Sequence, residues 1–373
     1  MVRLWTCPSR PNACRSIRAL VGANGQRTSS FHRSNALLGG AVRMTQRNIR
    51  VFVADDIPPW VMDRLGSQFR LTTHLAFDHD TRAIISGSDS SGNRTIDAGL
   101  LDRFPALEVI VGFGTGYDRI DVEVAWKRGI TVTNTPNVHA EDVADFTVGL
   151  LITTLRQMPA ADAFVRRGLW SSRPYPLLGE SLQGKKVGIV GMGAIGKALA
   201  RRLAAFNVDI SYHGRNPQPN LPFLYHSSIL SIARDVDILV LAIPGGPSTE
   251  KLVDASVLNA VGENGYLVNV SRGSVVCEAS LLVALSSGSI KGAGLDVFAH
   301  EPAINPAFFS LENVVLQPHV ASATTRTREA MWQLVIDNLI SWADRSEAIT
   351  PVQPTLVTQN FNSTVERMIS QRG

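Results

Sequence analysis

The feature that most constrains this chain is a glycine-rich turn between an apolar run and an alanine-rich stretch. Residues 187–190 are apolar enough to form a buried strand, and Gly191, Gly193 and Gly196 follow in the spacing G-x-G-x-x-G. The first glycine permits a tight turn, the second lets the backbone approach a pyrophosphate, and the third lets the next helix pack closely on the strand. That helix is expected to begin at Ala194 and to point its N-terminal amides at the anion. Glycine-rich turns also serve as plain connectors, but the strand before this one and the helix after it favour a dinucleotide site.

Composition indicates an ordinary globular protein without a membrane segment. The chain has 373 residues, of which 45% are hydrophobic and 18% charged, and this length suggests about two domains. The longest apolar runs, such as residues 238–243, fall far short of the roughly 18 residues that a transmembrane helix needs. No membrane partner is therefore expected.

The positive charge is concentrated at the N-terminus. The first 43 residues contain seven arginines and no Asp, Glu or Lys. Since the formal net charge of the whole chain is +4, the rest of the chain carries a net charge of −3. This mildly acidic body gives no support for a nucleic-acid partner.

Residues 1–45 are expected to be a targeting or disordered extension. The segment is rich in Arg and Ser, lacks acids and ends near Met44, so it resembles a mitochondrial transit peptide. Translation from Met44 would instead make it a gene-model artefact or a disordered tail, and the sequence leaves both interpretations open. The expected location is cytoplasmic, or mitochondrial if the segment is a transit peptide. Cys277 is the one thiol outside the extension, which fits a reducing compartment and predicts neither a disulfide framework nor a metal cluster.

Two series of α/β units follow the extension, because short apolar runs alternate with helical patterns. In the first series, strands are expected near residues 49–53, 83–86, 107–112 and 130–132, with a helix near 58–65. In the second series, strands are expected near residues 187–190, 208–212, 237–242, 266–270, 292–296 and 314–316.

The segments that join and follow these series carry different patterns. Apolar residues recur at helical spacing in residues 141–156, whereas residues 157–183 contain several prolines and are expected to form an extended arm. An amphipathic helix is expected at about residues 325–342, and the tail after Ser346 is expected to be loosely ordered.

Three segments after the glycine turn place polar groups just beyond an expected strand. They are residues 268–274, 294–302 and 316–322, which contain Arg272, Glu301 and His319. Ligands bind at the carboxyl ends of strands in open parallel sheets, so these segments are candidates for chemistry.

At this point the chain resembles the D-isomer-specific 2-hydroxyacid dehydrogenases over about residues 50–345. Several motifs carry the resemblance in the family's order: Gly114-Thr-Gly-Tyr-Asp-Arg-Ile-Asp121, Asn134-Thr-Pro136, Glu141-Asp-Val-Ala-Asp145, the glycine turn, Ser271-Arg-Gly273, Asp296-Val-Phe-Ala-His-Glu-Pro302 and Pro318-His319.

The resemblance implies an α/β fold of two doubly wound parallel-sheet domains with a cleft between them. Residues 46–155 plus 324–350 would form a flavodoxin-like substrate domain, and residues 156–323 a Rossmann NAD(P) domain. Residues 157–183 would be a dimerisation arm, so a homodimer is expected, and residues 351–373 a C-terminal tail.

The resemblance further implies that Arg272, Glu301 and His319 form a catalytic triad. Reduction of a 2-keto acid needs a proton donor near neutral pH, which His319 can be. A carboxylate such as Glu301 would stabilise and orient the imidazolium, and Arg272 offers a planar fork to the substrate carboxylate and ketone. Taken singly, these residues could instead be a surface or interdomain arginine, a helix-start acid and a core histidine.

The resemblance also assigns binding residues. The amides of Thr115 and Gly116, with Arg272, are expected to hold the substrate carboxylate, and Asp296 matches the residue that contacts the nicotinamide carboxamide. The full set of expected cofactor contacts is Gly191, Gly193, Ala194, Ile195, Gly196, His213, Arg215, Asn216, Pro244, Thr249, Val270, Ser271, Asp296 and His319.

The remaining histidines show no pattern that indicates a site. His300 stands beside Glu301 but is expected to face solvent, and no partner pattern is evident for His74, His79, His139 or His226. The spacing of the histidines, cysteines and acids does not predict a metal site.

The end of the strand after the glycine turn favours NADPH over NADH. An NAD site carries an acid there for the ribose hydroxyls, but this chain has His213, and Asp209 lies too early in the strand to substitute. Arg215 could pair with a 2′-phosphate, with hydrogen bonds from His213 and Asn216, although it could also be an ordinary surface arginine. NADH use remains possible.

The expected activity is reduction of a small 2-keto acid, because the chain resembles the glyoxylate/hydroxypyruvate reductase branch. A phosphoglycerate dehydrogenase-like enzyme is an alternative, although the short C-terminus leaves no room for a regulatory domain. A second class of alternative is a nucleotide-binding protein like the corepressors of this superfamily, which can retain the triad. The preferred keto acid depends on loops, such as residues 86–90, whose conformation the sequence does not reveal.

Overall fold

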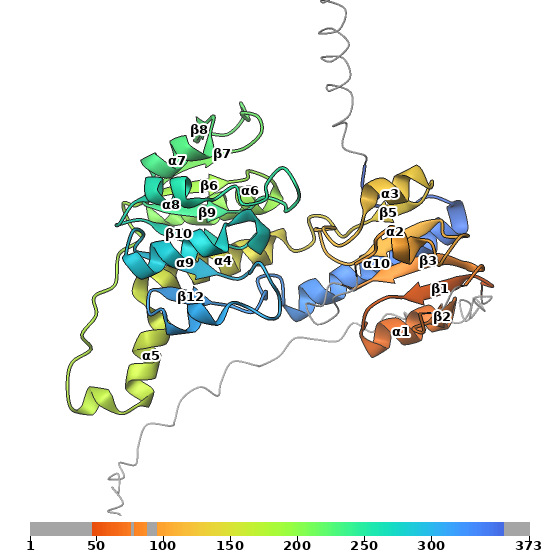
Figure 1. Cartoon of the computed structure of the whole chain (residues 1–373), viewed down its shortest axis with the longest axis horizontal. Helices are drawn as coiled ribbons and strands as arrows, with labels where there is room; N and C mark the ends of the chain where they lie inside the picture. The colour runs from red at the N-terminus through yellow and green to blue at the C-terminus, as the bar shows by residue number, and fades with distance from the viewer. Residues whose placement is uncertain (1–46, 76–77, 88–94, 354–373) are drawn as a thin grey trace, which may run out of the picture. The chain divides into compact units, whose positions relative to one another are not determined.

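The computed structural model describes residues 47–75, 78–87 and 95–353 (Figure 1). The expected extension, the pocket loop beyond Gly87 and most of the expected tail lie outside these ranges. Among the helices within them, none is both long and apolar enough to cross a membrane.

The first sheet has five parallel strands in the order β2-β1-β3-β4-β5. They are β1 (Arg50–Val53), β2 (Arg70–Thr72), β3 (Thr81–Ser86), β4 (Val109–Gly112) and β5 (Thr131–Thr133). This is the strand order of a flavodoxin-like sheet, as the sequence predicted. The prediction omitted β2 because this edge strand is short and partly exposed, and therefore lacks an apolar run.

Helices cover both faces of the first sheet, which explains its nearly continuous apolar strands. Alternate residues of β1 point to opposite faces, so that Val51 joins one core cluster and Phe52 the other. One face packs against α1 (Pro59–Gly66) and α10 (Thr325–Arg345), and the other against α2 (Ala98–Leu101) and α3 (Val122–Lys127).

The second sheet has seven parallel strands in the order β12-β11-β10-β9-β6-β7-β8. They are β6 (Lys186–Val190), β7 (Asp209–His213), β8 (Leu224–His226), β9 (Ile238–Leu241), β10 (Tyr266–Asn269), β11 (Gly292–Leu295) and β12 (Val314–Leu316). The six expected strands are confirmed. The additional strand, β8, lies at the sheet edge, where Leu224 is exposed, so its sequence carries no buried-strand pattern.

Helices also cover both faces of the second sheet. The chain forms α4 (Ala140–Arg156) and α6 (Ala194–Leu203) on one face, and α7 (Ile229–Asp235), α8 (Ala255–Val261) and α9 (Glu278–Ser287) on the other. Short 3₁₀ turns occur at η1 (Leu169–Ser171), η2 (Ala204–Phe206), η3 (Gly273–Val275) and η4 (Pro306–Ser310).

The long helix α4 packs mainly with the second sheet. Its Val143, Leu150 and Leu151 share a core cluster with β6 and α6, which differs from the boundary expected near residue 155. At its other end, Asp142 accepts hydrogen bonds from the hydroxyls of Thr324 and Thr327 at the start of α10. Helix α4 on the second sheet and helix α10 on the first sheet are therefore hydrogen-bonded to each other.

The expected extended arm begins with a helix, which corrects the sequence prediction. Gln157 has φ +49° and ends α4, and α5 (Met158–Arg166) starts at the next residue. Pro159 lies in the first turn of α5, where proline removes no intrahelical hydrogen bond, so it is compatible with the helix. Regular helix or strand is then absent between η1 and β6, as expected for an arm.

The segment directly after α10 is also more ordered than expected. The buried side chain of Asn338 accepts hydrogen bonds from the amides of Ile349 (3.0 Å) and Thr350 (2.9 Å). It donates to the Leu334 carbonyl and to the Thr350 hydroxyl, both at 2.9 Å. The sequence prediction was wrong here because hydrogen bonds from the buried Asn338 amide and from residues beside β5, and not an apolar pattern, hold the segment.

We expect Asn338→Leu to destabilise the fold by about 2–3 kcal/mol, because it leaves the two amides without their acceptor. The free energy of unfolding in urea would measure the loss. As a control on the same helix, Gln333→Leu should change it by less than about 0.5 kcal/mol, since its amide is bonded to Arg64 and Asp337 near the surface. Equal losses in the two variants would contradict this interpretation of Asn338.

Candidate active site

The glycine turn has the geometry that its sequence predicts. Gly191 has φ +101°, and a Cβ there would lie 2.4 Å from the Ala242 carbonyl oxygen. A Cβ on Gly196 would lie 2.1 Å from the Gly191 carbonyl oxygen, so α6 approaches the turn at a distance only glycine allows. Gly193, by contrast, faces open space. It precedes α6 and no side chain caps this helix end, so these residues fit a bound pyrophosphate.

Hydrogen bonds hold the loop after β7 beside the glycine turn. The Gln218 side-chain amide donates to the Met192 carbonyl (2.9 Å), and its backbone amide donates to the Tyr212 hydroxyl (2.7 Å). The Tyr225 hydroxyl donates to the Gly214 carbonyl (3.2 Å). Two of these anchors belong to β7 and β8, so the edge strand missed in the sequence helps to shape the loop.

The side chains expected to select the cofactor lie in this loop. Nδ1 of His213 contacts the His226 carbonyl at 2.8 Å, which leaves Nε2 as its other hydrogen-bonding atom. Arg215 and Asn216 are exposed, and within the described residues the structure gives Arg215 no ion pair. Arg215 is therefore available for an anion. The next loop, after β9, contains Pro244, whose carbonyl accepts from the Thr249 hydroxyl at 2.8 Å.

Asn269 organises the loop that carries Arg272. Its Oδ1 accepts from the Ser271 amide (3.0 Å) and hydroxyl (2.8 Å), and its Nδ2 donates to the Arg272 carbonyl (3.0 Å). Val270, the residue between β10 and this turn, donates its amide to the Leu241 carbonyl. The sequence analysis missed Asn269, although an asparagine that closes a turn just after a strand is a recognisable signal.

Asp296 anchors the loop that carries His319. Its side chain is fully buried, and its two oxygens accept from the amides of Val320 (2.8 Å) and Ala321 (2.9 Å). Burial raises the pKa of Asp296 above its ordinary value, and these amides and His319 oppose that shift. Its own carbonyl accepts from the His319 amide at 2.8 Å. His319 is thus held at φ +55°, a backbone conformation that residues other than glycine rarely adopt.

His319 and Glu301 form a hydrogen-bonded pair. Nδ1 of His319 lies 2.7 Å from Oε2 of Glu301, and Oε1 of Glu301 accepts from the Phe298 amide at 2.9 Å. Burial acts to raise the pKa of Glu301. The His319 hydrogen bond and charge, the Phe298 amide and the Arg272 charge outweigh it, so this pKa lies below its ordinary value of 4.5.

Arg272 contacts the turn after β4. Its Nε donates to Oδ2 of Asp118 (2.6 Å), and its Nη1 donates to the Ser271 carbonyl (2.8 Å). A Cβ on Gly116 would lie only 1.7 Å from Nη2 of Arg272, so a side chain there would displace the guanidinium. The structure therefore brings Arg272 to the Thr115–Gly116 turn, and its charge also acts on Glu301.

Hydrogen bonds to the residues just after β5 hold the Thr115–Gly116 turn in place. The Gly114 amide donates to Oγ1 of Thr135 (2.9 Å), and the Asn134 side chain donates to the Thr115 carbonyl (2.8 Å). Oγ1 of Thr115 also lies 3.4 Å from Nδ1 of His139. Burial and the charges of Arg272 and Arg328 lower the pKa of His139.

Two histidines that lacked a partner pattern in the sequence do have partners. His139 faces Thr115, and Nδ1 of His226 lies 2.9 Å from the Ser231 hydroxyl. Sequence spacing gave no sign of the first contact, because it joins residues that follow different strands. His300 is exposed, as expected. Within the described residues no group of three or more metal-ligating side chains converges.

Comparison with known proteins places this geometry in context. Residues 148–321 match the sequence model of the D-isomer specific 2-hydroxyacid dehydrogenase NAD binding domain. The chain is 41% identical over 304 residues to a 2-ketogluconate reductase of Gluconobacter oxydans, which is 81% of this chain and 98% of that protein. It is 42% identical over 282 residues to a glyoxylate/hydroxypyruvate reductase of Arabidopsis thaliana, covering 76% and 88% of the two chains.

A solved structure gives a similar match along the chain. It is an NADPH-dependent glyoxylate/hydroxypyruvate reductase from Sinorhizobium meliloti in complex with NADP and malonate. The TM-score is 0.78 at 45% sequence identity, and the match covers 82% of this chain and 97% of that one.

The contact between Glu301 and His319 is expected to make a pH-dependent contribution to the free energy of unfolding. A carboxylate with a lowered pKa stabilises the fold above its ordinary pKa of 4.5, and this contribution is lost as the pH falls through the lower folded value. We expect Glu301→Gln to reduce the free energy of unfolding at about pH 5.5 and to reduce it less at about pH 3.5. Urea unfolding at both pH values would measure this, with exposed Glu312→Gln as the control. A difference from wild type that does not change with pH would contradict it.

Proposed function

Because the chain belongs to the D-isomer specific 2-hydroxyacid dehydrogenase family, we propose that it is an NADPH-dependent reductase of a small 2-keto acid. Glyoxylate and hydroxypyruvate are the proposed substrates, since the similar Arabidopsis and Sinorhizobium proteins carry those names. The observation that supports the catalytic proposal most directly is the 2.7 Å contact between His319 and Glu301, in a site that also receives the charge of Arg272.

His319 is the proposed proton donor. Glu301 contacts Nδ1, so the transferable proton would be held at Nε2 and passed to the ketone oxygen of the substrate. Glu301 stays ionised near neutral pH because its pKa is lowered, and its contact with Nδ1 fixes the plane of the His319 ring. The loop bonds to Asp296 hold His319 in place.

Arg272 and the Thr115–Gly116 turn are proposed to bind the substrate carboxylate. Asp118 and the Ser271 carbonyl accept from Nε and Nη1 of Arg272, whereas Nη2 faces the Gly116 backbone. A carboxylate bound there would meet a cation and backbone amides together, and hydrogen bonds to a charged group are stronger than those between neutral groups.

A reduced nicotinamide dinucleotide would supply the hydride when bound. The glycine turn and the N-terminus of α6 are proposed to hold its pyrophosphate, because Gly193 is open and α6 has no side-chain cap. Arg215 is proposed to hold a 2′-phosphate, since it is exposed and β7 ends in His213 where an NAD site has an acid. NADH would remain a possible but weaker donor.

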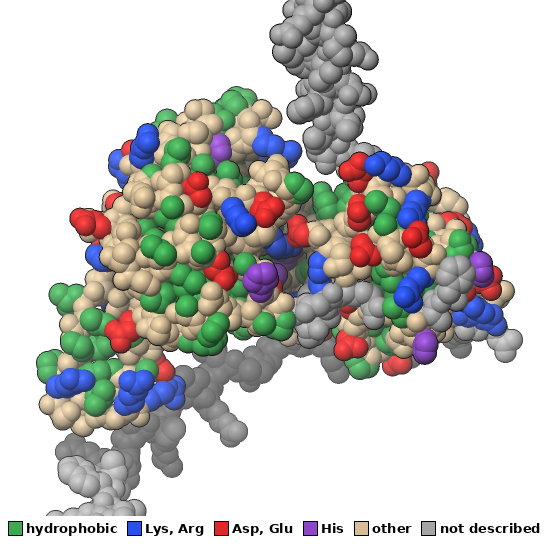
Figure 2. Space-filling view, in the orientation of Figure 1, with side chains coloured by type: hydrophobic (Ala, Val, Ile, Leu, Met, Phe, Trp, Pro, Cys, Tyr) green, Lys and Arg blue, Asp and Glu red, His purple; other side chains and the backbone are tan. Residues whose placement is uncertain are grey.

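We also propose that the two sheets bind different ligands and that the arm mediates formation of a homodimer. The first-sheet unit, residues 46–139 with 324–350, would bind substrate, and α4 with the second sheet, residues 140–323, would bind the cofactor. The arm at residues 157–183, at the lower left of Figure 2, presents exposed apolar side chains interspersed with arginines. These are Met158 (51% exposed), Val165 (53%), Trp170 (69%), Leu177 (42%) and Leu178 (95%).

We expect His319→Ala to lower kcat by about 100-fold or more with NADPH and glyoxylate or hydroxypyruvate, because the proton donor is lost. Steady-state assays with a panel of 2-keto acids, including 2-ketogluconate, would test this and the substrate class together. The exposed His300→Ala is the control and should keep wild-type turnover. Near-normal turnover of His319→Ala would refute the assignment, and no turnover of the wild type with any acid would favour a binding protein instead.

We expect Arg215→Ala to erode a preference for NADPH and to leave NADH kinetics nearly unchanged. A charge-assisted contact to the 2′-phosphate contributes roughly 1.5–3 kcal/mol, or about 10- to 150-fold in kcat/KM. Assays with both cofactors would measure it, with the exposed Arg234→Ala as the matched control. Equal kcat/KM for the two cofactors in the wild type would argue against NADPH selectivity. An equal effect of Arg215→Ala on both would move the phosphate site elsewhere.

A further inference from the structure

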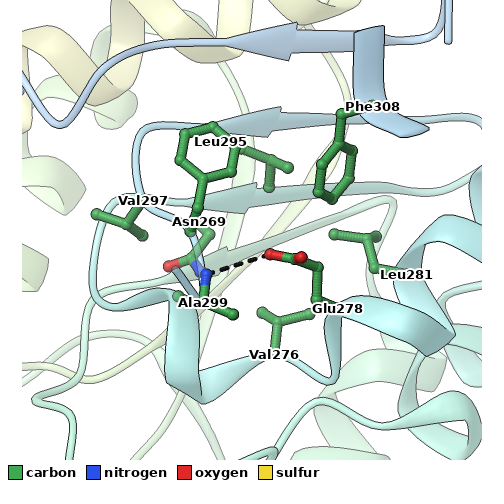
Figure 3. Close-up of a pocket in the computed structure, with 10 residues that line it drawn as sticks. Asn269, Val276, Glu278, Leu281, Leu295, Val297, Ala299 and Phe308 are labelled. Atoms are coloured by element: carbon green, nitrogen blue, oxygen red, sulfur yellow. Dashed lines mark hydrogen bonds between the residues drawn. The ribbon is translucent and has the colours of Figure 1, made fainter. Parts of the chain in front are cut away.

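A second carboxylate contacts the loop that carries Glu301. Glu278 is the first residue of α9, and its Oε2 accepts a hydrogen bond from the Ala299 amide at 3.1 Å (Figure 3). The neighbouring amide, of Phe298, donates to Glu301 itself at 2.9 Å. Two successive amides of one loop are therefore bonded to two different carboxylates, of which only Glu301 belongs to the triad.

The same stretch of loop is fixed from its other side by the chain that follows Arg272. A Cβ on Gly273 would lie 1.8 Å from the Phe298 carbonyl carbon and 2.4 Å from the Ala299 nitrogen. The backbone at Gly273 therefore packs directly against the peptide between Phe298 and Ala299. Gly273 and Glu278 lie at the two ends of one short segment, joined through η3. This segment connects Arg272 to the loop of Glu301.

Glu278 contributes the only ionisable side chain among the residues that line a small cavity under the loop. The others that Figure 3 draws are mostly apolar, such as Leu281, Leu295 and Phe308, and the space holds no more than about one water molecule. Among these lining side chains, Glu278 is the one that accepts a hydrogen bond from the Ala299 amide, which lies at the exposed edge of the loop. The carboxylate of Glu278 and the backbone at Gly273 therefore hold this peptide from two sides.

We propose that Glu278 is a positioning residue, which keeps Glu301 in contact with His319 and at a fixed spacing from Arg272. Without its acceptor, the Ala299 peptide can turn, and the adjacent Phe298 amide then no longer aligns Glu301. The amides of Thr115 and Gly116 would keep their position, because their turn follows β4 of the other sheet. This inference rests on the proposed function, in which Glu301 orients the proton donor.

The test compares Glu278→Ala, Glu278→Gln and the exposed Glu263→Ala in the full chain. In Glu278→Ala we expect kcat to fall by about 10- to 100-fold, because a small displacement of a catalytic group has effects of that size. The KM for NADPH should change less than about twofold, since the glycine turn is untouched. Glu278→Gln keeps an oxygen acceptor for the Ala299 amide and should recover most of the turnover, and Glu263→Ala should match wild type.

Two further readouts separate positioning from a general structural role. The pH dependence of kcat and the titration of the His319 imidazole, followed by NMR without cofactor, should both change in Glu278→Ala and return in Glu278→Gln. If Glu278→Ala does not fold, Glu278→Asp, which withdraws the acceptor by one methylene, should show the same changes. A lower melting temperature with unchanged kcat, pH profile and His319 titration would overturn the proposal. If His319→Ala is inactive and Glu278→Ala is unaffected, only the positioning role of Glu278 is overturned. If His319→Ala is active, the proposed function is refuted as well.

Discussion

The geometry of the site depends on the buried carboxylate of Asp296 and the two amides that it accepts. A carboxylate without exposure is costly unless hydrogen bonds compensate for its lost hydration, and here the amides of Val320 and Ala321 do so. A path of the loop that removed these amides would take both donors away from the buried carboxylate. The same hydrogen bonds hold His319 in an uncommon backbone conformation. The bonds that compensate for the burial of Asp296 therefore also place the imidazole of His319.

Close backbone approaches extend this order to the other loops. Gly116, Gly196 and Gly273 each lie where a side chain would overlap a neighbour: the Arg272 guanidinium, the Gly191 carbonyl and the Phe298–Ala299 peptide. The Gly273 contact connects the Arg272 loop to the Glu301 loop through the main chain, the Gly196 contact closes the glycine turn on itself, and the Gly116 contact meets the side chain of Arg272. All of these loops follow the carboxyl ends of parallel strands, so the sheet brings them to one edge before any side chain contributes.

The sequence predicted the elements whose residues signal their own surroundings. Buried strands have apolar runs, and the glycine turn requires a conformation that few other residues adopt, so both were found. The edge strands β2 and β8 were missed because their exposed residues, such as Arg70 and Leu224, hide the pattern. Helix α5 was missed because the prolines of this segment indicated an extended arm. Pro159, however, lies in the first turn of the helix, where proline is compatible with helical structure. Partnerships such as Arg272 with Asp118, or Thr115 with His139, join distant positions, and residue spacing holds no information about them.

The short segment after α10 has a consequence for the association of this chain with others. It lies beside β5, the last strand of the first sheet, where the Val352 amide donates to the Val132 carbonyl and Pro351 pairs antiparallel with Thr133. An open strand edge is a template on which another chain can add and aggregate. Here the protein occupies its own edge, and Pro351, which has no amide hydrogen to donate, limits how far a ladder can grow outward. Loss of the Asn338 anchor would therefore expose a surface prone to intermolecular β-pairing.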